Sequence, residues 1–215
     1  MYVRRVALSF RFPCMCQPTF SKRFVTVAFG MLLFGSVLFS GCSTDSEPRL
    51  QTDEALVTRC RSALTPHLKR GFNRDVAFYV DLTRPSNQNR FFVLDLRSNQ
   101  VLAKGLCCNG RTDAQGNVLY SNRNGSNCSS HGAAKVSYRY RGQFGKAYKL
   151  EGLEETNSNM FTRSVVLHSH SCIPETPQAG PICVSEGCPT VNPAFLETLA
   201  GYIDHSAKPI LLYIE

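Results

Sequence analysis

Short apolar runs separated by turn-forming residues constrain the fold of this 215-residue chain most strongly. The runs cover residues 75–82, 90–96, 100–106, 133–142, 146–153, 163–169 and 208–215. Each has the length and composition of a β-strand, and the runs at 90–96 and 100–106 flank a three-residue turn that predicts a hairpin. The pattern indicates a mostly β domain, a barrel or sandwich with a few short helices.

Two segments have helical spacing instead. Residues 53–69 repeat apolar side chains at helical intervals, with Thr52 as the predicted N-cap. Residues 193–203 follow Asn192, which is a good capping residue, and begin with proline, which is favoured at the first helical position. Residues 109–132 are rich in Gly, Asn and Ser and predict a long loop, and loops of that length are usually functional or disordered.

The N-terminus predicts export. Five basic residues precede an apolar run at 25–39, which ends in small residues, as in a signal peptide. The run is shorter than the roughly 20 apolar residues that span a bilayer. Gly41-Cys42 resembles a lipobox, so Cys42 is expected to carry a lipid as the first mature residue. An ordinary cleaved signal or an uncleaved anchor is the alternative.

These features divide the chain into a signal peptide at 1–41, a polar tether at 42–52 and one folded domain at 53–215. The signal contains five basic and no acidic residues, which leaves 19 basic against 16 acidic residues, a net charge of +3. This charge is too small to predict nucleic-acid binding, and no basic stripe with interleaved aromatic residues is present.

Export makes the cysteines informative, because disulfides persist in oxidising compartments. Beyond Cys42 the chain has seven cysteines, at 60, 107, 108, 128, 172, 183 and 188. Seven thiols cannot all pair, so we expect three disulfides of open connectivity and one free thiol. Adjacent Cys107 and Cys108 are expected to have different partners, because a bridge between neighbours is strained. The alternative is that several are reduced core residues, Cys60 among them.

Cys188, in the sequence VSEGCPTV (184–191), is the candidate nucleophile. A thiol is largely protonated at neutral pH, so a base must assist it, and a third group must orient that base. His168 and His170 lie at the end of the strand-like run 163–169, where a histidine would be held rigidly.

The residues around Cys188 favour acyl transfer. Gly187 permits a tight turn before the cysteine, and Pro189 fixes the exit from it. Successive N–H groups of Glu186, Gly187 and Cys188 are expected to form an oxyanion hole for the attacked carbonyl.

No metal or other cofactor is expected. Cys183 and Cys188 lack the second pair of ligands that a zinc site needs. A metal held by His168, His170 and Cys172 stays as a weaker alternative.

Four stretches, in this order, resemble the L,D-transpeptidase (YkuD-like) catalytic domain, and more closely its divergent branch, the murein L,D-transpeptidase catalytic domain family. They are FFVLDLRSNQVL (91–102), YSNRNGSNCSSHGAAKVSYRYRGQFGKAYKLEGLE (120–154), RSVVLHS (163–169) and SEGCPTV (185–191). The resemblance covers about residues 75–215 and implies an L,D-transpeptidase-like β-barrel or sandwich.

The resemblance also implies roles. Cys188 would be the nucleophile, His168 the base and Gly187 part of the catalytic turn. The backbone carbonyl of Ser169 would hold the His168 tautomer. His131, in a stretch that imitates the family motif but lacks its thiol, is expected to be structural or at the rim of the cleft.

Four further residues are expected on the substrate side. Arg163 and Ser185 match positions that recur in the branch and would be structural or substrate-orienting. Glu186 stands where the wider family has a second histidine. His170 stands where the branch commonly has a small residue, and it is the alternative base.

Together with the N-terminal signal, Cys42 and the small net charge, the resemblance predicts an exported bacterial cell-envelope enzyme, a lipid-anchored monomer that binds no nucleic acid. Its substrates would be peptidoglycan stem peptides, attacked by Cys188 to form a thioester that an amine or water resolves. One alternative is an inactive peptidoglycan-binding lipoprotein. Another is an unrelated exported cysteine peptidase or amidase, although in papain-type enzymes the nucleophile usually precedes its histidine, and here His168 precedes Cys188.

Overall fold

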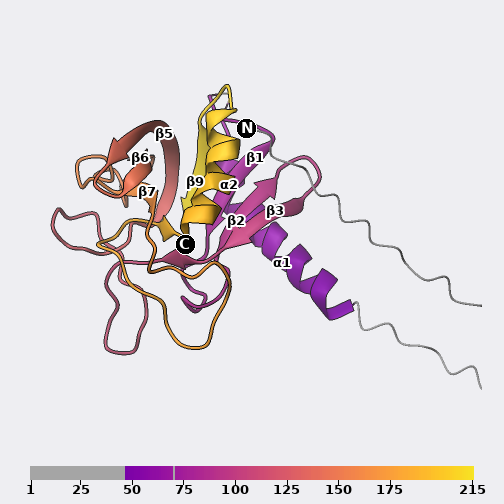
Figure 1. Cartoon of the computed structure of the whole chain (residues 1–215). Coiled ribbons are helices and arrows are strands. Elements are labelled where there is room, and N and C mark those ends of the chain that lie inside the picture. Colours follow the sequence, from indigo (N-terminus) through magenta and orange to yellow (C-terminus); the bar gives the residue numbers. More distant parts are fainter. Residues whose placement is uncertain (1–46, 70) are drawn as a thin grey trace, which may run out of the picture. The chain divides into compact units, whose positions relative to one another are not determined.

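A computed structural model describes residues 47–69 and 71–215 (Figure 1). The predicted signal peptide and Cys42 lie outside the described residues. Within the described part of the chain, no helix is both long and apolar enough to cross a membrane.

Three helical segments are present: α1 (Glu47–Leu64), the short 3₁₀ helix η1 (Thr65–His67) and α2 (Pro193–Asp204). Helix α1 begins inside the segment predicted to be a tether, so the prediction that it starts after Thr52 is wrong. Proline at the second position of α1 suits the first turn of a helix, where its missing N–H costs no hydrogen bond. Asn192 caps α2 as predicted, because its side chain accepts a hydrogen bond from the Ala194 N–H at 2.8 Å.

Nine strands form the rest of the regular structure in residues 47–69 and 71–215. They are β1 (Val76–Val80), β2 (Phe91–Asp95), β3 (Gln100–Gly105), β4 (Cys107–Cys108), β5 (Gly132–Gly142), β6 (Gly145–Gly152), β7 (Val166–Ser169), β8 (Thr190–Val191) and β9 (Ile210–Ile214). Each of the seven predicted runs overlaps one of them, and β5 and β6 begin one residue before their runs. The sequence did not predict β4 and β8, because two residues are too few to show a period.

The strands make one sheet in the order β3-β2-β1-β9-β5-β6-β7-β8-β4. The mostly β class is confirmed, but the described residues form no closed barrel, so that part of the prediction is wrong. The two edge strands, β3 and β4, are separated in the chain by Leu106 alone. One bent segment therefore contributes both edges of a strongly curved sheet.

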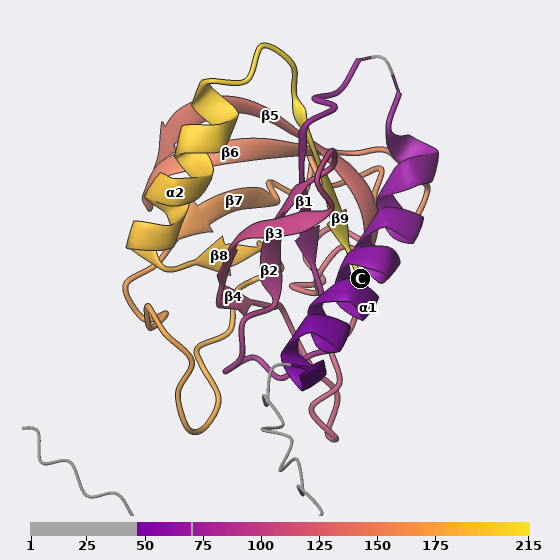
Figure 2. The same cartoon turned by 90° about the vertical axis from the view of Figure 1, so that its right-hand side faces the viewer.

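Alternating side chains separate two apolar clusters on the two faces of the sheet. On β1, Phe78 and Val80 belong to the main core, whereas Ala77 and Tyr79 face the cluster under α1. Strands β2 and β9 alternate in the same way. Helix α2 packs into the main core, and Figure 2 shows α1 and α2 on opposite sides of the sheet.

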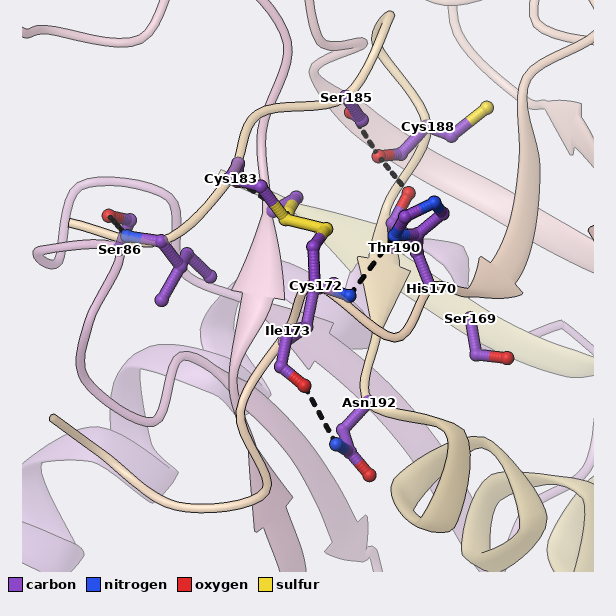
Figure 3. The surroundings of a disulfide bond; sticks show 12 residues. Ser86, Ser169, His170, Cys172, Ile173, Cys183, Ser185, Cys188, Thr190 and Asn192 are labelled. Carbon is purple, nitrogen blue, oxygen red and sulfur yellow. Dashed lines mark hydrogen bonds between the residues drawn. A yellow bond between two sulfur atoms is a disulfide. The ribbon is translucent and has the colours of Figure 1, made fainter.

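The cysteines depart from the expected pairing. One disulfide, Cys172–Cys183, is present in the described part of the chain (Figure 3). Five cysteines are free, namely Cys60, Cys107, Cys108, Cys128 and Cys188. Three disulfides do not form, because Cys60 and Cys107 are buried in clusters on opposite faces of the sheet. An odd thiol therefore no longer singles out Cys188.

Cys107 and Cys108 were expected to form disulfides with different partners, but both are free thiols. The Cys108 sulfur lies 3.5 Å from that of Cys183 and makes a hydrogen bond to the Cys183 carbonyl. This contact ties β4 to the loop that carries the disulfide.

Candidate active site

A row of paired residues crosses the sheet beside Cys188. The register pairs Tyr140 of β5 with Ala147 of β6, Ala147 with His168 of β7, and His168 with Thr190 of β8. Cys188 lies two residues before Thr190. The pairing of β7 with β8 thus sets His168 opposite Thr190, in the segment that carries Cys188.

The direction of the His168 side chain follows from strand alternation. Val165 and Leu167 point into the main core, so Val166 and His168 point to the opposite face. His168 is buried, and the Phe144 ring from the β5–β6 turn stacks on its imidazole at a centroid distance of 4.6 Å. The base candidate is therefore shielded from water on one side by an aromatic ring.

Two hydrogen bonds assign the tautomer of His168. Its Nδ1 lies 3.1 Å from the Ser169 carbonyl oxygen, which only accepts, so Nδ1 carries the proton. Its Nε2 lies 3.0 Å from the Thr190 hydroxyl. In the neutral imidazole, Nε2 accepts the Thr190 proton and has the lone pair that a general base needs.

The Cys188 thiol is anchored at the start of β7. Its sulfur accepts the Val166 N–H at 3.4 Å, and it lies 3.9 Å from the Ser164 carbonyl oxygen. Ser164 has a φ of 58°, a conformation that is strained for a residue other than glycine and that recurs at functional sites. Figure 3 shows the thiol pointing away from the Cys172–Cys183 disulfide.

The turn before Cys188 is held from within. The Ser185 hydroxyl donates to the Cys188 carbonyl at 2.7 Å and accepts the Gly187 N–H at 3.2 Å. Gly187 therefore does not offer its N–H to an oxyanion hole, which corrects one part of that expectation. The N–H groups of Glu186 and Cys188 have no acceptor among the described residues, so those two stay candidates.

Arg163 connects this turn to the long loop before β5. Its guanidinium donates to the carbonyl oxygens of Ser121 and Cys128 and to the hydroxyls of Ser126 and Ser130. These acceptors are neutral, so Arg163 keeps its positive charge beside the cysteine turn. Arg163 was expected to be either structural or substrate-orienting, and these contacts favour a structural role.

Burial sets the protonation state of Cys188. It raises the pKa of the thiol above its ordinary value, and the negative charge of Glu186 acts in the same direction. The Val166 N–H and the charges of Arg163 and Lys149 oppose this shift. The net effect is a neutral thiol at neutral pH.

Burial acts on His168 in the opposite direction. It lowers the pKa of the imidazole, His170 contributes to the lowering, and the hydrogen bond to Ser169 opposes it. The resting pair is thus a neutral thiol and a neutral imidazole rather than an ion pair.

The raised thiol pKa predicts a pH dependence. Alkylation of Cys188 by iodoacetamide should be slower than that of a free cysteine at about pH 7, and should still be rising at about pH 9, because the thiolate forms only as pH rises through the raised pKa. Intact mass spectrometry over time measures the rate, with Cys188→Ser as the blank. A rate that levels off below about pH 7 would instead indicate a thiolate–imidazolium pair.

The other predicted residues lie at the margins of this arrangement. His170 is exposed beyond the end of β7, and its Nδ1 accepts the Cys172 N–H. Glu186 is exposed. The His131 ring lies between those of Tyr120 and Tyr213, at centroid distances of 5.4 and 6.0 Å.

A metal site is not formed by these residues. In residues 47–69 and 71–215, no group of three or more His, Cys, Asp or Glu side chains is placed to hold a metal. The weaker alternative of a metal at His168, His170 and Cys172 is wrong, because Cys172 is in the disulfide.

Sequence reasoning missed several residues that shape the site. Thr190 binds the base, and Asn109 accepts the Ser185 N–H on its backbone carbonyl at 2.8 Å. Buried Arg90 in turn donates to the Asn109 side chain. No local pattern marks Asn109 or Arg90. The position of Thr190 so soon after Cys188 was a signal that could have been used.

The fold and site define a mostly β domain with a half-buried cysteine beside a neutral strand histidine. A family model described as the L,D-transpeptidase catalytic domain (YkuD_2) matches residues 53–213. The chain belongs to the L,D-transpeptidase catalytic domain family. This confirms the resemblance and excludes the alternative of an unrelated peptidase or amidase.

Similar solved structures include an L,D-transpeptidase from Mycobacterium smegmatis, with 14% identity and a TM-score of 0.39 over 66% of this chain and 58% of that one. An L,D-transpeptidase from Stackebrandtia nassauensis has 12% identity and a TM-score of 0.40 over 78% and 66%. The cell shape determining protein Pgp2 from Campylobacter jejuni has 10% identity and a TM-score of 0.41 over 65% and 47%. No curated protein sequence matches the chain.

Proposed function

We propose that this protein is a cysteine acyltransferase that acts on peptidoglycan stem peptides, as an L,D-transpeptidase or L,D-carboxypeptidase. The observation that carries the proposal is the register of a domain of this family, in which His168 of β7 pairs with Thr190 of β8, two residues after Cys188. The Ser169 carbonyl orients the imidazole so that its Nε2 faces the segment that carries Cys188. Nucleophile, base and orienting group are the parts that thiol catalysis needs.

In the first step, the Cys188 sulfur attacks the carbonyl between the third residue of the stem, a diamino acid, and the fourth, D-alanine. His168 takes the thiol proton at Nε2, which first exchanges its hydrogen bond to Thr190 for one to the thiol. The carbon–nitrogen bond then breaks, and D-alanine leaves with that proton on its amine. A thioester between Cys188 and the stem is the product.

In the second step, a nucleophile attacks the thioester and the sulfur leaves. An amine from a neighbouring stem gives a 3→3 cross-link, and water gives the carboxypeptidase reaction. Neutral His168 removes the proton of either nucleophile and returns it to the sulfur. The N–H groups of Glu186 and Cys188 are the candidate donors to the oxyanion in both steps.

The proposed location is the bacterial cell envelope, with the monomeric domain held at a membrane by a lipid on Cys42. The predicted signal peptide supports a location outside the cytoplasm, where the Cys172–Cys183 disulfide would be stable. A lipid anchor would keep the domain within reach of the cell wall.

An inactive peptidoglycan-binding lipoprotein is the second candidate. The bond between His168 Nε2 and Thr190 favours it, because in this arrangement the base is hydrogen-bonded to Thr190 and not to the thiol. Burial of Cys188, which raises the pKa of its thiol, also favours it.

A carbapenem, a β-lactam that traps enzymes of this family, separates the two candidates. We expect the purified protein to gain one covalent adduct by intact mass spectrometry, and the Cys188→Ala variant to gain none. Cys60→Ala is the matched control, because Cys60 is another free thiol, buried in the separate cluster under α1. No adduct on the wild type, or an adduct that persists in Cys188→Ala, would contradict the proposal.

A further inference from the structure

Lys149 lies on the face of the sheet that carries the candidate site. It is paired in register with Val166, whose N–H donates to the Cys188 sulfur. Its neighbours Tyr148 and Leu150 point into the main core, so the Lys149 side chain leaves on the opposite face. This is also the face of Val166 and His168.

The Lys149 ammonium is held by aromatic rings and not by an acid. It lies 4.9 Å from the ring centroid of Tyr140 and 5.4 Å from that of Phe161. Among the described residues, no carboxylate lies within 4.0 Å of the Lys149 ammonium. By contrast, Lys135 on β5 and Lys146 on β6 are both ion-paired.

A half-buried cation without a counter-ion is costly unless an anion joins it, and aromatic faces hold it in place without neutralising it. The arrangement therefore leaves the charge of Lys149 available to a ligand.

The surroundings of Lys149 have room for a peptide. Its charge reaches Cys188 and opposes the rise of the thiol pKa. An open surface pocket of about 450 Å³ adjoins it through Phe161 and is lined by Tyr138, Glu151, Gly152, Ser158 and Phe161. Phe161 is 44% exposed, so its ring is accessible from solvent. A ligand in this pocket would lie against Phe161, whose ring contacts the Lys149 ammonium.

We infer that Lys149 binds a carboxylate of the donor stem peptide and so selects the substrate of Cys188. The inference rests on the proposed function and adds the chemical group that the site recognises. A donor stem has two such groups near the attacked carbonyl, the terminal carboxylate of D-alanine and, where the third residue is diaminopimelate, a side-chain carboxylate. Both would form a charge-assisted hydrogen bond with the ammonium.

Three synthetic tetrapeptides test the inference: one with both carboxylates free, one amidated at the terminus and one amidated on the side chain. The release of the terminal residue gives kcat/KM for each. We expect the wild type to prefer the free acid over one of the amides by about tenfold or more, as a charge-assisted hydrogen bond predicts. The amide that is rejected identifies which carboxylate Lys149 binds.

The variants are Lys149→Met, Lys149→Arg and the control Lys146→Met. Lys149→Met should react with the free acid as slowly as the wild type reacts with the rejected amide. Lys149→Arg should keep most of the preference, because it keeps the charge. Lys146→Met should keep all of it, because Lys146 is a β6 lysine paired with Glu197. Thermal denaturation of each variant checks that the fold persists.

Each other outcome overturns the inference. If the wild type shows no preference among the peptides, or Lys149→Met leaves the preference intact, Lys149 does not bind a carboxylate. If Lys149→Met slows all three peptides equally, its charge acts on the Cys188 thiol, and the proposed function stands without the inference. If the wild type forms neither a peptide product nor a carbapenem adduct, the proposed function itself fails.

Discussion

Replacing Gly187 with alanine should abolish most of the acylation of Cys188 and destabilise the domain. A Cβ at this position would lie 2.4 Å from the Cys128 carbonyl oxygen, and the φ of Gly187 is +105°, where side chains are strained. The backbone conformation costs about 1–2 kcal/mol, and the collision, which only a backbone shift relieves, adds about 1–3 kcal/mol.

The activity effect of Gly187→Ala should be larger than its stability effect. The Cys128 carbonyl also binds Arg163, so relieving the collision moves both the cysteine turn and its anchor. A displacement of about 1 Å at a reacting group can cost about 100-fold in rate, and we expect at least that loss in the rate of carbapenem acylation.

The variant Gly145→Ala separates the cost of backbone strain from the cost of a steric collision. Gly145 also has a positive φ, of +82°, but a Cβ there would meet nothing within 4 Å. It should therefore lose about 1–2 kcal/mol in the free energy of unfolding, measured by denaturant titration, with acylation little changed. If Gly187→Ala and Gly145→Ala had equal effects on the free energy of unfolding and on the acylation rate, the close contact between Gly187 and the Cys128 carbonyl would contribute to neither.

The fold was largely predictable because its strands carry their own signals. Seven runs with strand-like composition overlap β1, β2, β3, β5, β6, β7 and β9, and the Asn192 cap fixed the start of α2. The pairing at one edge of the sheet was not predictable, because it depends on β4 and β8, which have two residues each and are defined by their partners. The start of α1 was missed because a polar segment can be helix or tether.

The site was predictable where the chain places its chemistry close together. Cys188, Gly187 and Ser185 lie within one turn, and His168 with Ser169 ends one strand, so the local sequence indicated all of them. The contacts of Lys149, Thr190 and Arg90 arise from register and burial, which a single sequence does not show.

The number of cysteines gave a wrong prediction of three disulfides. Thiols that are buried on different faces of the sheet cannot pair, whatever their number. Cys60 and Cys107 illustrate this, since each is fully buried in a different cluster.

Arg90 shows how far such unseen contacts reach, because it is a buried cation that joins the curved sheet to the cysteine turn. It is 1% exposed and donates to the carbonyl oxygens of Cys107 and Arg84 and to the side chain of Asn109. Burial lowers its pKa, yet an arginine stays charged at neutral pH. The backbone carbonyl of Asn109 accepts the Ser185 N–H, so these contacts continue to the turn of Cys188.

The substitution Arg90→Met should lower the free energy of unfolding by about 3–5 kcal/mol, because it leaves two buried acceptors and one partly buried acceptor without a donor. Arg90→Lys should rescue little of this, since one ammonium lacks the planar fork of a guanidinium. The control is Arg97→Met, which removes an exposed ion pair with Asp75 and should cost about 0–1 kcal/mol. Denaturant titration gives the energies, and carbapenem acylation in native buffer reports on the cysteine turn.

Acylation decides whether Arg90 supports the site or only the fold. If the chain of contacts through Asn109 and Ser185 positions Cys188, folded Arg90→Met protein will acylate more slowly than folded Arg97→Met protein. Equal rates in the folded fractions would confine Arg90 to holding the bent segment between β3 and β4. An unfolding energy equal to that of Arg97→Met would mean that the buried acceptors find other donors, and that the curvature of the sheet does not depend on this cation.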